Sequence, residues 1–270
     1  MSSFKTSVKN FLFKISASNP SLVSSYYRLT YRPKRGTLAE LLDLYSRTHR
    51  PVRFIQVGAN DGFYHDPLYK FIRMYDWQGV MLEPQPTVFR NYLTKLHARS
   101  PGITPVNAAL APNDGESTIY RIAFSELRWA TGLTSFQKDT LEKAIDSGHV
   151  ARLAARYGET LPKSRDEFIK EEKVRCVSVD TLMKEHGMKE VDWVQIDAEG
   201  FDYEIVKLLD VGKNAPKVIV YERSHLSGED QSACLKLLAD NEYSTADFGE
   251  NTVAMKRPLG AFERFFRKTV

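Results

Sequence analysis

A short apolar run that breaks into a glycine turn is the feature that most constrains this chain. Residues Phe54 to Gly62 read Phe-Ile-Gln-Val-Gly-Ala-Asn-Asp-Gly. The run indicates a buried strand, while Gly58 and Gly62 can adopt positive φ and leave no side chain in the way of a ligand. A helix is expected from about His65 to Tyr75, and the free amides at its start can face a polar group. The stretch therefore predicts a strand that delivers the backbone to a nucleotide.

A second strand with an acid at its tip strengthens this prediction. Gly79 to Leu82 is a short apolar run that ends in Glu83-Pro84. In a doubly wound sheet, an acid at the tip of the strand after the glycine turn can accept hydrogen bonds from both ribose hydroxyls of a nucleoside. Gly62 and Glu83 lie about 20 residues apart, which is the spacing expected for such a pair.

Strands and helices alternate along most of the chain. A helix is expected over Leu38 to Tyr45, and the strands after Val52 to Val57 and Gly79 to Leu82 are expected at Ile103–Val106, Ser117–Ile122, Val174–Val179, Trp193–Ile196 and Val218–Tyr221. Tyr243–Phe248 and Thr252–Met255 are expected to close the sheet as an antiparallel pair. The alternation predicts an α/β fold with a mostly parallel sheet.

Three segments stand apart from this pattern. Residues 1–36 form a basic amphipathic extension, in which Asn19 to Gly36 is expected to be an irregular connector, and residues 257–270 form a basic tail. Within the main domain, residues 37–256, an insertion of about 121–173 is expected to be a lid or substrate-binding element with one helix from Lys138 to Tyr157. Its candidates for substrate contacts are Arg128, Trp129, Ser135 and His149.

Composition is that of a globular protein with free thiols. The chain has 270 residues, of which 42% are hydrophobic and 27% charged, enough to bury a sizeable core. Cys176 and Cys234 show no metal-ligand spacing, and we expect both to be buried thiols in a reducing compartment.

Charge is distributed unevenly. Residues 1–36 carry seven Lys or Arg and no acid, and residues 256–270 carry five against one acid, whereas the whole chain is only +4. The body is therefore acidic between two basic ends. This disfavours nucleic acid as a partner, because basic tails alone give only unspecific, salt-sensitive attraction.

Apolar residues recur at helical spacing in both basic ends. They are Phe4, Val8, Phe11, Leu12 and Ile15 at the start, and Leu259, Phe262 and Phe266 at the other end. These ends either lie on an anionic membrane surface or pack on the body or a partner chain, and periodicity favours packing. No run is long enough to span a bilayer, and lysines interrupt a signal-peptide core, so we expect a cytoplasmic protein, peripheral at the inner face of a membrane under the first interpretation.

Five motifs together resemble one known family. They are Val57-Gly-Ala-Asn-Asp-Gly62, Gly79-Val-Met-Leu-Glu-Pro84, Asn107-Ala-Ala-Leu110, Ser178-Val-Asp-Thr-Leu182 and Asp197-Ala-Glu-Gly200. In this order and spacing, over roughly residues 52–256, they look like the FkbM family of S-adenosylmethionine-dependent methyltransferases. The resemblance implies a class I methyltransferase (Rossmann-like) fold, with a seven-stranded, mostly parallel sheet, helices on both faces and a reversed last hairpin. It also implies O-methylation of a hydroxyl on a sugar, glycolipid or polyketide-like acceptor.

The resemblance implies a cofactor site as well. Gly58, Ala59, Asn60 and Gly62 would wrap the methionine part of S-adenosylmethionine, Glu83 would bind its ribose hydroxyls, Pro84 and Gln85 would border the adenine, and Asn107, Ala108 and Ala109 would close over it. Asp197 and Glu199 would lie beside the sulfonium and the acceptor. Gln56 stands where the family usually has an acid that helps to hold the cofactor's ammonium, although an amide oxygen still accepts a hydrogen bond.

An alcohol acceptor needs alignment and a place for its proton. The candidate bases are the strand-end residues Asp197, Glu199, Glu222 and His225. An alternative is Mg²⁺ held by Asp197 and Glu222, which would lower the pKa of the acceptor hydroxyl. Two carboxylates are a thin ligand set, so the favoured arrangement contains no metal.

Two other functions stay open at this point, and so does the oligomeric state. The chain could be an inactive binding or scaffolding protein on a methyltransferase fold, an alternative that rests on Gln56 and the basic ends. A nicotinamide dinucleotide site is weaker, because the full Gly-x-Gly-x-x-Gly pattern is absent and the Asp197 motif would be unexplained.

Overall fold

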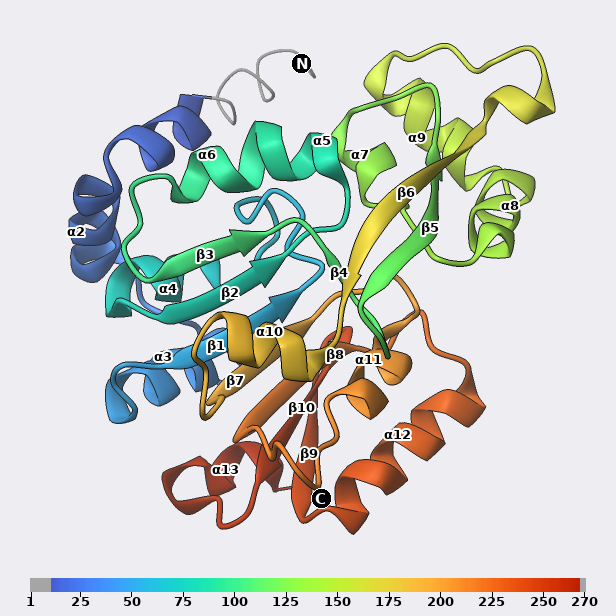
Figure 1. The fold of residues 1–270 in the computed structure, drawn as a ribbon. Helices are drawn as coiled ribbons and strands as arrows, with labels where there is room; N and C mark the ends of the chain where they lie inside the picture. The colour runs from blue at the N-terminus through green and yellow to red at the C-terminus, as the bar shows by residue number, and fades with distance from the viewer. Residues whose placement is uncertain (1–10, 268–270) are drawn as a thin grey trace.

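A seven-stranded sheet forms the centre of the molecule (Figure 1). The computed structural model describes residues 11–267. In spatial order the strands are β3 (Ile103–Val106), β2 (Gln78–Leu82), β1 (Arg53–Val57), β7 (Trp193–Ile196), β8 (Val218–Glu222), β10 (Asn251–Lys256) and β9 (Tyr243–Phe248). The first five strands are parallel, and β10 runs antiparallel to both β8 and β9. The predicted mostly parallel sheet with a reversed last hairpin is confirmed.

Both faces of the sheet are covered by helices, so its central strands are apolar on both sides. Ile55, Val194 and Ile219 pack on one face with α10 (Val179–Glu185), α11 (Asp202–Leu208) and α12 (Gly228–Asp240). Phe54 and Trp193 pack on the other face with α3 (Leu38–Thr48) and α4 (Tyr69–Tyr75). The remaining helices of the body are the continuous α5 (Pro86–Val88), η1 (Phe89–Leu93) and α6 (Thr94–His97), and the short η3 (Gly260–Phe262) and α13 (Glu263–Phe266).

Two of the predicted strands lie outside the main sheet. β5 (Gly115–Ile122) and β6 (Ile169–Val177), together with β4 (Ala109–Leu110), form a three-stranded sheet in the order β4-β6-β5. The expectation that they continue the parallel alternation is therefore wrong. β3 is an edge strand and contains Pro105, which has no N–H to donate to a further neighbour. The small sheet rises from that edge and carries the insertion (Figure 1).

The insertion has a core of its own. Its helices are α7 (Arg128–Thr131), α8 (Lys138–Asp146), α9 (His149–Tyr157) and η2 (Arg165–Glu167). Trp129, Leu141 and Val150 are buried together there. The single helix expected over Lys138 to Tyr157 is in fact α8 and α9, because Gly148 takes a left-handed φ of 71° between them.

The N-terminal segment is helical where an irregular connector was expected. Residues 11–18 are helical, and α2 spans Pro20–Thr30, with its proline at the first helical position. Val23 and Tyr27, one turn apart, pack against Tyr69 of α4. The expectation holds for residues 31–36 and is wrong for Pro20–Thr30, because the Ser, Tyr and Arg residues there tolerate a helix once tertiary packing stabilises one face.

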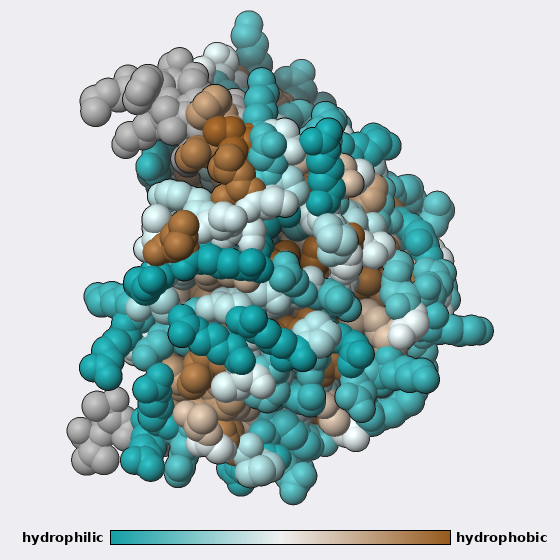
Figure 2. Space-filling view, turned by 90° about the vertical axis from the view of Figure 1, so that its left-hand side faces the viewer, coloured by the Kyte–Doolittle hydropathy of each residue, from teal (hydrophilic) through white to brown (hydrophobic). Residues whose placement is uncertain are grey.

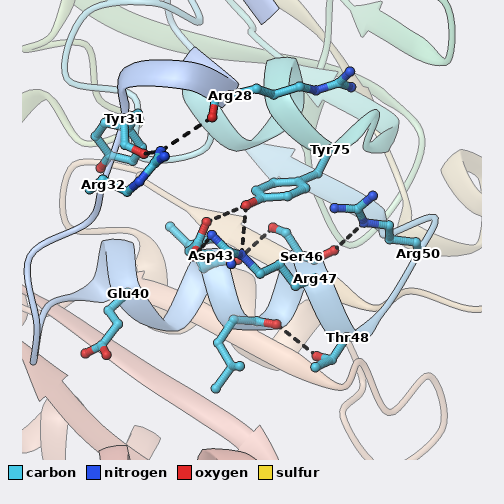
Figure 3. A network of polar contacts seen from close by, with 12 residues as sticks. Arg28, Tyr31, Arg32, Glu40, Asp43, Ser46, Arg47, Thr48, Arg50 and Tyr75 are labelled. Atoms are coloured by element: carbon cyan, nitrogen blue, oxygen red, sulfur yellow. Dashed lines mark hydrogen bonds and ion pairs between the residues drawn. The ribbon is translucent and has the colours of Figure 1, made fainter. Parts of the chain in front are cut away.

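Polar contacts fix α2 and α3 around α4. Arg28 of α2 donates from Nε to the Met74 carbonyl oxygen at 2.7 Å and from Nη2 to Asp76 Oδ2 at 3.0 Å. Asp43 of α3 accepts from the Tyr75 hydroxyl, and Arg47 pairs with the same carboxylate (Figure 3). The N-terminal helices are thus part of the folded body.

The two basic ends differ in what the structure shows of them. Phe4 and Val8 of the predicted apolar stripe lie outside the described residues. Leu259, Phe262 and Phe266 of the other end pack on the core with α3, as the packing interpretation expects. Cys176 and Cys234 are buried free thiols, as predicted. Within residues 11–267, no helix has the length and apolar character needed to cross a membrane.

Replacing Gly79 tests the close packing of β1 and β2. Gly79 pairs with Phe54, and a Cβ at this position would lie 1.9 Å from the Phe54 carbonyl oxygen. The two strands cannot separate without breaking the sheet, so Gly79→Ala is expected to lower the free energy of unfolding by about 3 kcal/mol or more, measured by urea denaturation.

The matched control is the same substitution at Gly228, the first residue of α12, where an added Cβ meets nothing within 4 Å. Gly228→Ala is expected to leave stability unchanged or raise it by up to about 1 kcal/mol. Equal urea midpoints for the two variants would contradict the proposed strand contact.

Candidate active site

A pocket lies at the carboxyl edge of the sheet, where the tips of β1, β2 and β7 meet the insertion. Its empty volume is about 760 Å³, which includes open solvent at its mouth. Of the predicted site residues, those that line it are Gly58, Asn60, Glu83, Pro84, Gln85, Ala108, Ala109, Asp197 and Glu199. The sequence analysis thus identified one side of a single cavity.

The glycine turn passes directly over the tip of β7. Gly58 has φ +77°, and a Cβ there would lie 1.9 Å from the Asp197 carbonyl oxygen. The Asp197 N–H donates to the Val57 carbonyl at 3.0 Å, and the Ala59 N–H donates to the Leu82 carbonyl at 2.9 Å. The turn is therefore fastened to β7 on one side and to β2 on the other.

Glu83 is buried at the tip of β2 and organises the turn. Only 2% of the residue is exposed. Oε2 accepts from the Asn60 N–H and Oε1 from the Gln85 N–H, each at 2.8 Å. Burial raises the pKa of Glu83 to about 7, although both N–H donors oppose that rise. Each carboxylate oxygen retains a second lone pair, so ribose hydroxyls can still donate to it.

Arg128 of the insertion closes over the glycine turn. Its Nη1 donates to Asn60 Oδ1 at 2.6 Å and lies 3.0 Å from Asp61 Oδ1. Its positive charge also opposes part of the rise in the pKa values of Glu83 and Asp197 that desolvation causes. The sequence predicts Arg128 only as a substrate contact. Its bond with the glycine turn could not be predicted, because Asn60 lies 68 positions away along the chain.

The second sheet and the insertion supply the apolar wall. Ala109 and Leu110 of β4, Ile119 of β5 and Phe136 line the pocket opposite the glycine turn. Gln85 joins the wall to β2, because its Nε2 donates to the Thr131 carbonyl at 2.9 Å. These groups make this part of the lining largely apolar.

Of the other predicted substrate contacts, one lines the pocket and two do not. Ser135 lines the pocket. Trp129 instead belongs to the core of the insertion and donates to Glu159 Oε2 at 2.7 Å. His149 is exposed at the start of α9, away from the pocket lining.

Several residues predicted to bind the cofactor lie behind the pocket lining. Gly62 and Ala59 are buried and do not line the pocket. A Cβ at Gly62 would lie 2.7 Å from Leu93 Cδ1, so only glycine fits there. Asn107 donates from Nδ2 to the carbonyls of Glu83 and Pro84, at 2.8 and 3.0 Å. These residues shape the loops that bear the lining groups.

Gln56 is also buried behind the pocket and lies beside a carboxylate. Its Nε2 donates to Asp66 Oδ2 at 3.3 Å, and it pairs in register with Gln195 of β7. Asp66 also accepts from the Leu68 and Tyr69 N–H groups at the start of α4. The amide of Gln56 thus contacts an acid ten positions later, but Asp66 is not part of the pocket lining.

Four acids gather at the tips of β7 and β8. Asp197 is exposed in the open pocket, yet desolvation by the surrounding protein, followed by the charges of Glu199, Glu222 and Asp202, raises its pKa to about 7. Asp202 is fully buried and accepts from the N–H groups of Ala198, Gly200 and Glu222. The role of Asp202 could not be predicted from the sequence, because it joins the loop before α11 to the tip of β8, which is distant along the chain.

His225 balances part of this negative charge. Its Nδ1 lies 3.3 Å from Glu199 Oε2, and its Nε2 lies 4.0 Å from Glu222 Oε1. The hydrogen bond with Glu199 raises the pKa of His225 to about 9. The ring is therefore a cation at neutral pH, and it lies beside the lining of the pocket without being part of it.

The acids do not assemble into a metal site. Within residues 11–267, no group of three or more His, Cys, Asp or Glu side chains is arranged to hold a metal ion. Asp202 is committed to backbone amides, so the Mg²⁺ alternative gains no ligand beyond Asp197 and Glu222 and is not supported.

Comparison with solved structures gives similarities at low identity. An FkbM methyltransferase from Methylobacillus flagellatus KT is 13% identical, with a TM-score of 0.46, over 92% of this chain and 59% of its own. The O-methyltransferase from Bacillus cereus in complex with SAH is 11% identical, with a TM-score of 0.40, over 95% and 100%. SAH-bound PaMTH1 from Podospora anserina is 12% identical, with a TM-score of 0.41, over 88% of each chain.

The sequence itself gives the assignment. Comparison with curated proteins finds no match. A family profile for the methyltransferase FkbM domain matches residues 56–250, which include the glycine turn, Glu83, the insertion and the acidic strand tips. The seven-stranded sheet with its reversed hairpin is the class I methyltransferase fold expected for such a domain. The chain belongs to the FkbM methyltransferase family.

Proposed function

We propose that this chain is an S-adenosylmethionine-dependent O-methyltransferase that acts on a hydroxyl of a sugar, glycolipid or polyketide-like acceptor. One observation carries the proposal. The pocket that contains the glycine turn and buried Glu83 also contains Asp197, a carboxylate whose pKa is about 7. A cofactor clamp and a base suited to neutral pH thus share one cavity.

The pocket residues fit the parts of S-adenosylmethionine. Gly58, which must be glycine because the turn crosses the Asp197 carbonyl, lines the pocket with Asn60 and Arg128, where they would contact the methionine part. Glu83 would accept from the ribose hydroxyls, and the apolar wall with Ala109 would face the adenine. When bound, this cofactor supplies an electrophilic methyl group on a cationic sulfur.

Asp197 is the group that we assign as general base. A carboxylate with a pKa near 7 is partly ionised at neutral pH and can accept the proton that an alcohol loses as it attacks. Glu199 and Glu222 raise its basicity through their negative charges. His225, held as a cation between these two acids, positions their carboxylates and is not itself the base.

Titration calorimetry with S-adenosylmethionine and S-adenosylhomocysteine tests the cofactor site. The wild-type chain is expected to bind both. Glu83→Gln keeps the volume but replaces one acceptor oxygen with a donor facing a backbone N–H, so binding is expected to weaken by about tenfold or more. The unfolding temperature of the variant shows that it is folded. Absence of binding by folded wild-type protein would favour the scaffolding alternative.

Arg128→Ala tests the closure of the insertion over the turn. Losing the guanidinium that bonds Asn60 and pairs with Asp61 is expected to weaken S-adenosylmethionine binding by about tenfold. The control is Arg165→Ala, which removes an exposed ion pair with Asp146 elsewhere in the insertion and is expected to leave affinity unchanged. Equal affinity of both variants would remove Arg128 from the site.

The pH profile tests the assignment of Asp197. A base must be ionised, so kcat/KM for S-adenosylmethionine is expected to rise with pH and to be half-maximal near pH 7, the raised pKa of Asp197. Glu199→Gln removes a neighbouring negative charge, so the midpoint is expected to move to lower pH. An unchanged midpoint in that variant would argue against Asp197 as the titrating base.

Radiolabelled methyl transfer to a panel of hydroxylated acceptors tests the acceptor class. Each hydroxyl compound is paired with its deoxy analogue, and transfer is expected only to the former. Transfer to amines in preference to alcohols would leave the methyltransferase assignment standing and overturn the proposed hydroxyl acceptor.

A further inference from the structure

The outer face of α2 presents a row of exposed apolar side chains. Leu22, Tyr26 and Leu29 are 62%, 59% and 76% exposed. Their spacing of four and three residues places them on one side of the helix, over a length of about 10 Å. Val23 and Tyr27, on the opposite side, pack on α4. Most exposed leucines in a globular protein occur singly, so a row of this kind calls for an explanation.

Residues 11–18, which are also helical, carry two further exposed apolar side chains. Phe11 and Leu12 are 62% and 48% exposed. Phe13 turns inward and contacts Phe63, which follows the glycine turn, with ring centroids 5.7 Å apart. Ile15, assigned to the same apolar face as Phe11 from the sequence, also packs inward. Figure 2 views the side of the molecule on which α2 lies and shows brown apolar atoms exposed among hydrophilic ones.

The row is held in a fixed position. Ser24 donates from its hydroxyl to the Arg73 carbonyl at 2.7 Å, and Arg28 is anchored on the end of α4. The exposed side chains of α2 therefore point outward because their helix is packed on its other side.

The chain segment that carries the row has charges of one sign only. Residues 11–36 contain Lys14, Arg28, Arg32, Lys34 and Arg35 and no acid. Arg28 is neutralised by Asp76, and the other four are exposed. Glu40, the next acid along the chain, is already engaged by Arg264 and the Gly36 N–H. Apolar side chains flanked by unpaired cations match a bilayer with anionic headgroups.

We propose that this surface, formed by Phe11, Leu12, Leu22, Tyr26 and Leu29 with its flanking cations, docks on an anionic lipid bilayer. The exposed leucines favour lipid over nucleic acid, because phosphate contacts give them no apolar environment. The C-terminal apolar residues take no part, since Leu259, Phe262 and Phe266 are packed on the core.

Sedimentation of the full-length protein with vesicles tests the proposal. Binding is expected to vesicles that contain phosphatidylserine, to be weak on phosphatidylcholine alone, and to fall at high salt. The variant with Leu22→Ser, Tyr26→Ser and Leu29→Ser is expected to bind about tenfold or more weakly. Residues 1–10 are present in every protein compared, so the difference reports on α2.

The matched control changes the same residue types elsewhere, in the variant Tyr157→Ser, Leu161→Ser and Leu235→Ser, which are 42%, 37% and 40% exposed. It is expected to bind as the wild type does. No binding by the wild type, or equal binding by the α2 variant, would overturn the proposal. A dimer that forms without lipid and is lost in the α2 variant would also overturn it, in favour of a second copy as the occupant.

Discussion

The crossing of the glycine turn over the tip of β7 is the contact on which the rest of the site depends. Gly58 lies so close to the Asp197 carbonyl that a methyl group would overlap it. This one contact sets the distance between the loop proposed to hold the cofactor and the acid proposed to take the proton. Because both belong to central, doubly covered strands, the sheet fixes their relative position before any ligand arrives.

A second constraint is the concentration of negative charge around that crossing. Asp66, Glu83, Asp197 and Asp202 all have pKa values raised by desolvation, to between about 6 and about 7. Ionising such groups costs more free energy in the folded protein than in the unfolded chain. Their contribution to the free energy of unfolding is therefore full below their unfolded pKa values and is lost as pH rises through the raised folded values. Arg128 and protonated His225 offset part of this cost, and a cationic cofactor would offset more. Strongly perturbed pKa values of this kind are typical of functional sites, even though they lower the stability of the fold.

The insertion and the N-terminal helices extend the domain in different ways. The insertion has its own core, yet it reaches the glycine turn through Arg128 and forms part of the pocket wall. The N-terminal helices pack on α4 and touch the loop after the turn through Phe13, while α2 leaves an apolar face toward solvent. The insertion thus contacts the glycine turn itself, and the N-terminal helices contact Phe63 directly after it.

The sequence by itself determined the parts of the molecule that are local. Apolar runs ending in Gly58, Glu83 and Asp197 predict strand tips at one edge, because parallel strands bring their carboxyl ends together. The tertiary structure alone decided which side chains meet across long separations. It moved β5 and β6 out of the main sheet, paired Gln56 with Asp66, and brought Arg128 to Asn60. It also made α2 a helix, since packing against α4 supplied what weak local propensity could not. Periodicity indicates which residues are buried, whereas the segment that packs on them depends on the tertiary arrangement of distant parts of the chain.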